Sequence, residues 1–239
     1  MSMDGNYDYV KKTLAAFISH NKNGELLRDI CYNCDITEDE SIEDYYAKRA
    51  NSSFPWWAAG MTKFVFSIPD VDNYVFKIPF LTRFWYKGTD KEERLPQEDY
   101  CKYEAENYKL AKEKGVSDFF AETVYLCTFG DVPIYISEDA SISALDYCSN
   151  SVWHKTSNRS KKWSSAHFER QQGFGFDDEY APIAWLADRV DLLKIIDLLD
   201  FFREYKIVDI HSGNFVYTKD GILIVDYSGF GRYRYEDSC

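Results

Sequence analysis

The densest group of polar residues in the chain is Asp209-Ile210-His211-Ser212-Gly213-Asn214, and Asp226-Tyr227-Ser228-Gly229 follows shortly after it. If a hairpin joins the two segments, Asp209, Asn214 and Asp226 direct three oxygen-bearing side chains toward one cleft. Mg²⁺ prefers such hard oxygen ligands together with phosphate oxygens, and the remaining carboxylate can orient an attacking hydroxyl. The alternative is that Asp209 and Asn214 cap a turn. We assign His211 no chemistry, because such a histidine more often packs and holds a loop.

A lysine in an apolar strand is the second feature that points to chemistry. Lys77 lies between apolar neighbours in the run Tyr74-Val75-Phe76-Lys77-Ile78, and an inward lysine needs an acidic partner. Glu104 and Glu106 are the candidates on the following helix. Glu104 is favoured because it shares a helical face with Tyr108 and Ala111, the alternative being that it is merely solvated.

These motifs together resemble the protein-kinase-like superfamily. Asp209 to Asn214 resembles its catalytic loop, and Asp226 to Gly229 resembles a variant of its Asp-Phe-Gly metal motif. The amino-acid sequence of this loop is most similar to that of aminoglycoside- and choline-kinase-like phosphotransferases and of short phage-type protein kinases. Ile134 to Glu138 resembles the strand that leads to the adenine hinge. The resemblance spans roughly Gly60 to Gly229, most of the chain.

The resemblance implies ATP and Mg²⁺ as cofactors and a role for each matching residue. Asp209 would be the catalytic carboxylate, and Lys77, oriented by Glu104, would hold the phosphates. Asn214 and Asp226 would bind the metal. The further nucleotide contacts implied are in the first loop and at the hinge: Gly60, Thr62, Ser137, Glu138 and Ala140.

Two departures from the family pattern stand out. No Gly-rich GxGxxG motif precedes the first hairpin, where Ala58 to Thr62 offers only Gly60, so phosphate cover is expected to be built differently. Only ten residues, Phe230 to Cys239, follow the glycine of the Asp226 motif. We therefore expect neither an activation segment nor the later helices that hold peptide substrates.

Hydrophobic spacing predicts the elements that carry these residues. Helical periodicity indicates two short helices over 7–33, a helix over 97–114 and a long, largely buried helix from Pro182 to Tyr205 that includes Leu193 and Ile196. Turn chemistry predicts three antiparallel strand pairs. Their strands are 62–68 with 74–80, 121–127 with 132–137, and 215–218 with 222–225. Residues 37–41 are expected to be an acidic linker and 146–178 a long loop or insertion.

This order predicts the α+β class, in the form of a two-lobed protein-kinase-like fold with a minimal C-terminal lobe and extra N-terminal helices. The expected parts are an N-terminal helical extension over 1–55, a kinase-like N-lobe over 56–140 and a truncated C-lobe over 141–239. Under two hundred residues remain for the two lobes, which is short for this architecture.

Composition excludes several classes of protein. The 239 residues are 45% apolar and 18% aromatic, enough for a sizeable core, so general disorder is excluded. The formal net charge of −12 argues against binding nucleic acid mainly through phosphates. The chain contains no apolar run long enough to span a membrane, and Asp4 and Asp8 stand where a signal peptide would be basic and apolar. We expect a cytoplasmic protein, in the host cytoplasm if it is phage-encoded.

The six cysteines are expected to be free thiols, because a chain of this length needs no disulfides. Only Cys31 and Cys34 form a CxxC pair. Neither a second pair nor histidines at matching spacing accompany them, so two free thiols are favoured over a metal or redox site.

The function expected from these observations is ATP- and Mg²⁺-dependent transfer of a phosphoryl group to a hydroxyl, with a protein serine or threonine as acceptor and a basic protein as substrate or partner. The chain's own segment Ser149 to Ser165 is a further possible acceptor. The alternatives are a pseudokinase-like module that acts by protein contact and a small-molecule kinase. A nucleic-acid role through Arg159, Lys161 and Lys162 is a more distant alternative.

Overall fold

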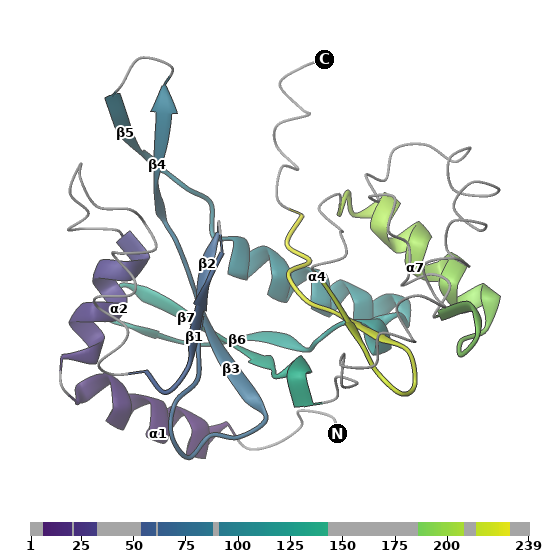
Figure 1. Ribbon diagram of the computed structural model, residues 1–239, viewed down its shortest axis with the longest axis horizontal. Helices are drawn as coiled ribbons and strands as arrows, with labels where there is room; N and C mark the ends of the chain where they lie inside the picture. Colours follow the sequence, from purple (N-terminus) through teal and green to yellow (C-terminus); the bar gives the residue numbers. More distant parts are fainter. Residues whose placement is uncertain are drawn as a thin grey trace, which may run out of the picture. The chain divides into compact units, whose positions relative to one another are not determined.

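The computed structural model has an α+β fold and describes residues 7–20, 22–32, 54–60, 62–87, 91–142, 186–207 and 214–229 (Figure 1). The chain divides into two compact units. Unit 1 comprises Met1–Ala105 and Thr123–Glu138, and unit 2 comprises Glu106–Glu122 and Asp139–Cys239. The three expected parts, 1–55, 56–140 and 141–239, stay a prediction. Within the described helices, no stretch is both long and apolar enough to cross a membrane.

Unit 1 is built on a five-stranded antiparallel sheet in the order β1-β2-β3-β7-β6. Its strands are β1 Trp57–Ala59, β2 Lys63–Phe66, β3 Tyr74–Pro79, β6 Thr123–Phe129 and β7 Val132–Glu138. The predicted β2–β3 and β6–β7 pairs are confirmed. In the β2–β3 turn, Asp70 and Asn73 have φ of 64° and 70°, a region that these two residue types tolerate better than most.

A proline in a central strand accounts for where the pairing between β3 and β7 stops. Pro133 lies in β7, which has neighbours on both sides, yet β3 pairs only with Tyr135 to Glu138. Pro133 therefore pairs with β6 alone, opposite Thr128. This arrangement spares the sheet the hydrogen bond that a proline cannot donate.

One face of the sheet is the apolar core of unit 1. The two predicted N-terminal helices are confirmed as α1, Asp8–Ser19, and α2, Asn23–Tyr32. They bury apolar side chains against alternate residues of β2 and β3 in a single cluster. The members with less than 3% exposure from these four elements are Leu14, Ile18, Leu27, Ile30, Cys31, Phe64, Phe66, Phe76 and Ile78. Because side chains alternate along a strand, the intervening residues of β2 and β3 lie on the opposite face.

A further hairpin in unit 1 lies outside the sequence prediction. Strands β4, Thr82–Lys87, and β5, Lys91–Pro96, form a two-stranded sheet of their own. The register pairs Thr82 with Pro96 and Lys87 with Lys91.

The helix predicted over 97–114 is α4, Tyr100–Lys114, and the boundary between the two units falls inside it. Asp99 lies just before its start and accepts a hydrogen bond from the Lys102 backbone N–H at 2.9 Å. This is N-terminal capping by a carboxylate. The helix ends at Gly115, whose φ of 75° is one that glycine adopts without strain.

Unit 2 packs helix α7, Leu192–Glu204, against the third predicted strand pair, which is confirmed as β8, Phe215–Tyr217, and β9, Ile222–Ile224. Aromatic rings dominate its core. The Phe120 ring lies 4.8 Å from that of Tyr227 and 5.5 Å from that of Phe201. Ala121 N–H also donates to the Ile224 carbonyl, which ties the segment after α4 to β9.

The prediction of one long helix from Pro182 to Tyr205 is wrong at its start. Asp191 is the N-cap of α7 and its carboxylate accepts from Leu193 N–H at 2.7 Å, while a separate turn closes at Val190 N–H on Leu186 O. The buried face of α7 therefore carries Ile195, Leu198 and Phe202. Leu193 and Ile196, which we expected to be buried, are 69% and 43% exposed. Residues 182–185, the linker 37–41 and the insertion 146–178 lie outside the described residues.

Replacing Asp191 with alanine is expected to destabilise the protein by about 1 kcal/mol, because the first turn of α7 loses its side-chain acceptor. Urea unfolding measures the change. Asp197, in the exposed part of the same helix, provides the control, and its change to alanine should be neutral or slightly stabilising. Equal losses for the two variants would contradict the capping role of Asp191.

Candidate functional site

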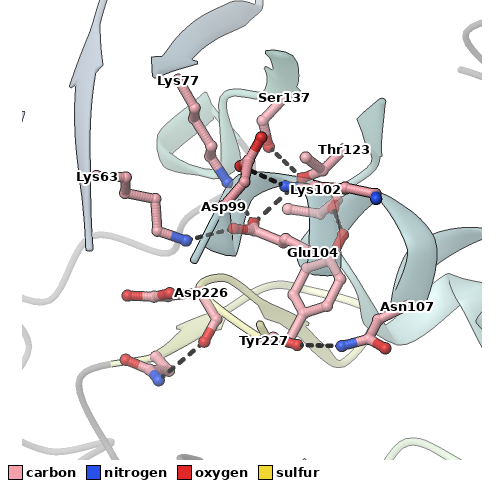
Figure 2. A network of polar contacts seen from close by, with 12 residues as sticks. Lys63, Lys77, Asp99, Lys102, Glu104, Asn107, Thr123, Ser137, Asp226 and Tyr227 are labelled. Carbon is pink, nitrogen blue, oxygen red and sulfur yellow. Dashed lines mark hydrogen bonds and ion pairs between the residues drawn. The ribbon is translucent and has the colours of Figure 1, made fainter. Parts of the chain in front are cut away.

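The face of the sheet opposite the phenylalanine core is polar. Val65 pairs with Lys77, Lys77 pairs with Tyr135, and Ser137 pairs with Thr123, so the residues of each pair share a face. Lys63, two residues before Val65, lies on this face as well. Helix α4 adds Glu104. The polar face therefore consists of Lys63, Lys77, Glu104, Thr123, Tyr135 and Ser137, and Figure 2 labels all of these except Tyr135.

Two lysines converge on one carboxylate at the centre of this face. Lys77 Nζ donates to Glu104 Oε1, and Lys63 Nζ donates to Glu104 Oε2 (Figure 2). Lys63 and Lys77 are 4% and 5% exposed and Glu104 is fully buried. Glu104 rather than the exposed Glu106 is thus the partner of Lys77, as the helical spacing indicates.

One hydroxyl group also contacts the carboxylate, and a second hydroxyl contacts the first. Thr123 Oγ1 donates to Glu104 Oε1 at 3.2 Å, and the hydroxyls of Thr123 and Ser137 lie 2.9 Å apart. Both residues are at most 1% exposed. A buried carboxylate with three donors on its two oxygens is fixed in position as well as in charge.

The electrostatics keep Glu104 ionised. Burial raises the pKa of its carboxyl, but the charges and hydrogen bonds of Lys63 and Lys77 outweigh that effect and lower the pKa to about 2. Nearby, burial raises the pKa of the Cys101 thiol well above its usual value. At neutral pH Glu104 is therefore a carboxylate and the nearby Cys101 is a neutral thiol.

The residues expected at the first loop lie at the β1–β2 turn. Gly60 is exposed, and its N–H donates to the Lys63 carbonyl at 3.1 Å, which closes the turn. Thr62 is buried, and its carbonyl accepts from Phe80 N–H. Their predicted contacts with nucleotide stay predictions.

The residues expected at the hinge lie at and beyond the end of β7. Ser137 is the hydroxyl partner of Thr123, and Glu138 pairs with Tyr74 at the last position of the strand. Ala140 begins the short 3₁₀ helix η2, Ala140–Ile142, and is buried. Their nucleotide contacts likewise stay predictions.

The structure brings the two predicted metal ligands together in unit 2. Asn214 Nδ2 donates to the backbone carbonyl of Asp226 at 3.2 Å, and Val225 N–H donates to the Asn214 carbonyl at 2.8 Å. The metal-binding atom of an asparagine is its amide oxygen, which this side-chain hydrogen bond does not use. The pair thus supplies one amide and one carboxylate, the oxygen ligands that suit Mg²⁺.

The segment after Asp226 is anchored on both sides. Tyr227 is fully buried, its hydroxyl donates to the Ala121 carbonyl at 2.7 Å, and its own carbonyl accepts from Asn107 Nδ2 at 2.8 Å. Asp226 itself has a φ of 55°, in the left-handed region. A residue held in such a conformation by its neighbours is typical of functional segments.

Asp209 and His211 lie outside the described residues, as does Cys34 of the CxxC pair. Cys31 is buried as a free thiol. Within the described part of the chain, no three His, Cys, Asp or Glu side chains gather as a metal-binding group.

Sequence reasoning missed three residues of this arrangement: Lys63, Thr123 and Asn107. Lys63 carried a usable signal, because it stands in the apolar run Lys63-Phe64-Val65-Phe66 much as Lys77 does in its own strand. Thr123 and Asn107 carry no such signal, since a threonine at a strand start and an asparagine in a polar helix are unremarkable in type.

Comparison with known proteins identifies no relative. No protein-family model matches the sequence, and neither a curated protein nor a solved structure matches it significantly.

Proposed function

We propose that this protein is an ATP- and Mg²⁺-dependent phosphotransferase with a two-lobed, kinase-like fold that transfers the γ-phosphate to a serine or threonine hydroxyl of a protein. The buried ion pair between Lys77 on β3 and Glu104 on α4 carries the proposal. A buried pair of this kind is expensive to desolvate, so pure packing would be served as well by apolar side chains. The ion pair is explained if its role is to position Lys77 for binding the phosphates of a nucleotide.

The other proposed site residues carry the amide and carboxylate groups that phosphoryl transfer needs. Asn214 and Asp226, joined by a hydrogen bond in unit 2, are the proposed metal ligands. The metal would neutralise charge on the phosphates. Asp209 is proposed to orient the acceptor hydroxyl and take its proton.

One observation favours a second candidate, a pseudokinase-like module that acts by protein contact. The β1–β2 turn is short, and the Gly60 N–H already donates to the Lys63 carbonyl. In phosphate-binding loops the backbone N–H groups face the ligand instead. A module that acts by protein contact would not need backbone N–H groups to bind a phosphate.

Transfer of labelled γ-phosphate from ATP tests the proposal. The acceptors are a basic peptide mixture containing Ser and Thr and the chain itself, followed by intact mass. We expect Mg²⁺-dependent labelling by the wild-type chain and a loss of at least about 100-fold in Asp209→Asn, the variant that lacks the proposed base.

Undiminished labelling by Asp209→Asn would contradict the role of Asp209. A wild-type chain that transfers nothing, yet is thermally stabilised by ATP and Mg²⁺, would instead support the binding module. Absence of both transfer and stabilisation would contradict both candidate functions as ATP-dependent ones.

A further inference from the structure

Two consecutive backbone carbonyls beside the proposed metal ligands each accept a hydrogen bond from an asparagine side chain. Asn214 Nδ2 donates to the Asp226 carbonyl at 3.2 Å. Asn107 Nδ2, on α4, donates to the Tyr227 carbonyl at 2.8 Å (Figure 2). Asn107 and Tyr227 both belong to unit 2, so this hydrogen bond lies within one compact unit. The proposed function gives Asn214 a role as a metal ligand but gives Asn107 none.

The backbone conformation of this segment explains why it needs side-chain donors. Strand β9 ends at Ile224, so the carbonyls of Asp226 and Tyr227 lie beyond its pairing with β8. Asp226 has a φ of 55°, a left-handed conformation that is unfavourable for residues with a side chain and that turns the chain out of the extended strand. Buried backbone carbonyls require hydrogen-bond partners. The two asparagine amides therefore stabilise a turn that strand pairing does not stabilise.

The asparagine at position 107 is unfavourable for the helix that carries it. Asparagine has a lower helix propensity than alanine or leucine, and Asn107 is only 3% exposed. Tyr108 and Ala111, close to it on α4, belong to the apolar core of unit 2. A buried amide has lost its hydrogen bonds to water and needs a partner within the protein. The Tyr227 carbonyl is such a partner.

The contacts of Tyr227 limit the freedom of Asp226, its neighbour in the chain. The Tyr227 carbonyl accepts from Asn107, and its hydroxyl donates to the Ala121 carbonyl at 2.7 Å. On the other side of Asp226, Val225 N–H donates to a carbonyl at the start of the β8–β9 hairpin. Because both neighbours are fixed, the direction in which the Asp226 side chain leaves the backbone is fixed as well.

The direction of a carboxylate matters when it binds magnesium. Mg²⁺ requires nearly ideal octahedral geometry at short distances, so a ligand that is turned away from its direction binds less well. Groups that orient a metal ligand without touching the metal change metal affinity by about 10- to 100-fold when they are removed.

We propose that Asn107 is a positioning residue for the Mg²⁺ site: its amide holds the Tyr227 carbonyl and thereby keeps the Asp226 carboxylate in the direction that binds the metal. The presence of the metal at Asp226 and Asn214 rests on the proposed function. The role of Asn107 rests on the hydrogen bonds around Tyr227 and on the left-handed φ of Asp226.

Titration with Mn²⁺, followed by electron paramagnetic resonance of the free ion, measures metal affinity without ATP and without phosphate transfer. Mn²⁺ prefers the same oxygen ligands as Mg²⁺. The relevant site is the Mn²⁺ binding that Mg²⁺ displaces and that Asp226→Asn removes. We expect Asn107→Leu, which has a similar shape but no donor, to weaken this binding by about 10-fold or more. In the transfer assay this variant should need about 10-fold more Mg²⁺ for its half-maximal rate, while its rate at saturating Mg²⁺ falls less.

Asp191→Ala separates metal binding from a general loss of stability. That variant weakens unit 2 by removing the N-cap of α7, and it should keep the wild-type affinity for Mn²⁺. Thermal unfolding compares the stability of the two variants. If Asn107→Leu does not fold, Asn107→Ala, which removes the same donor and favours the helix, replaces it with the same expected loss of affinity.

Four outcomes decide the role of Asn107. Wild-type Mn²⁺ affinity in a folded Asn107 variant, with binding that still depends on Asp226, would overturn the positioning role and leave the proposed phosphotransferase intact. Equal losses of affinity in Asp191→Ala and Asn107→Leu would also overturn it, because instability would explain both. Mn²⁺ binding that depends on Asn107 and Asp226, in a chain that transfers no phosphate, would support the positioning role and contradict the phosphotransferase. A wild-type chain without Asp226-dependent Mn²⁺ binding would overturn the positioning role, whether or not it transfers phosphate.

Discussion

Replacing Asp226 with asparagine is expected to reduce transfer of labelled γ-phosphate by at least about 100-fold while leaving the fold intact. The expected loss comes from the carboxylate charge, which we propose binds Mg²⁺ beside Asn214. Chelation of Mg²⁺ with EDTA should abolish wild-type transfer in the same way. Initial rates at saturating ATP, with and without added Mg²⁺, measure both effects.

Asparagine is the informative substitution because of the backbone. Asp226 has a φ of 55°, and asparagine tolerates the left-handed region at least as well as aspartate, whereas alanine does not. The hydrogen bond from Asn214 reaches the backbone carbonyl of Asp226 and therefore survives the change. The anchoring of Tyr227 to Ala121 and Asn107 does not involve the Asp226 side chain.

Asp220 supplies the matched control. It lies exposed in the turn of the same β8–β9 hairpin, so Asp220→Asn removes the same charge a few residues away. Transfer by that variant should equal that of the wild type. If Asp226→Asn keeps more than about a third of the wild-type rate, or if Asp220→Asn loses as much, the metal-binding role of Asp226 is wrong.

Local chemistry explains which parts of the fold could be predicted. The β2–β3 hairpin follows from two apolar, aromatic runs around Pro69 to Asn73, and the β8–β9 hairpin from Lys219-Asp220-Gly221. Helix α4 follows from its periodicity and its stop at Gly115. In each case the signal lies within a few residues of the element that it specifies.

The failures come from competition between signals. Strand β5 begins Lys91-Glu92-Glu93-Arg94, a charged run with low strand propensity. Its extended conformation is therefore stabilised by pairing with β4 rather than by its own sequence. Before α7, apolar residues continue the helical period through Leu186 and Val190. The N-cap Asp191 nevertheless begins a new helix there, because its carboxylate satisfies the first backbone N–H groups.

Only one contact of the candidate site was predictable from the sequence, because a buried lysine requires an acidic partner. An inward Lys77 requires an acid, and helical spacing selects Glu104. The second partner, Lys63, depends on two further facts, the strand register of β2 against β3 and the approach of α4 to that face. Both are long-range properties of the folded chain, so the convergence of Lys63, Lys77 and Thr123 on one carboxylate cannot be read from local spacing.

Replacing Glu104 with glutamine is expected to destabilise the protein by about 3 to 5 kcal/mol at pH 7, the cost of removing one partner from a buried ion pair. The carboxylate is fully buried and is the shared acceptor of Lys63 and Lys77. Glutamine has the same shape but no charge. Urea unfolding measures the change, and Glu106→Gln, on the exposed side of the same helix, should change stability by less than about 0.5 kcal/mol.

The loss of stability in Glu104→Gln depends on pH, and the pKa of Glu104 determines its direction. The pKa of Glu104 is about 2 in the folded protein against 4.5 for an ordinary glutamate, so the unfolded chain binds more protons in acid. The stabilisation is therefore complete above about pH 5 and declines as the pH falls toward 2. The difference between the wild type and Glu104→Gln should narrow by about 2 kcal/mol at pH 3.

The double variant Lys63→Met/Glu104→Gln tests whether charge causes the loss. If Glu104→Gln is destabilising because two ammonium groups lose their shared carboxylate, then removing the Lys63 ammonium should recover part of the stability, by about 1 kcal/mol or more. If the loss reflects shape or hydrogen bonding alone, Lys63→Met should add a further loss to that of Glu104→Gln. A pH-independent difference between wild type and Glu104→Gln, together with additive losses in the double variant, would show that Glu104 is not held ionised by the two lysines.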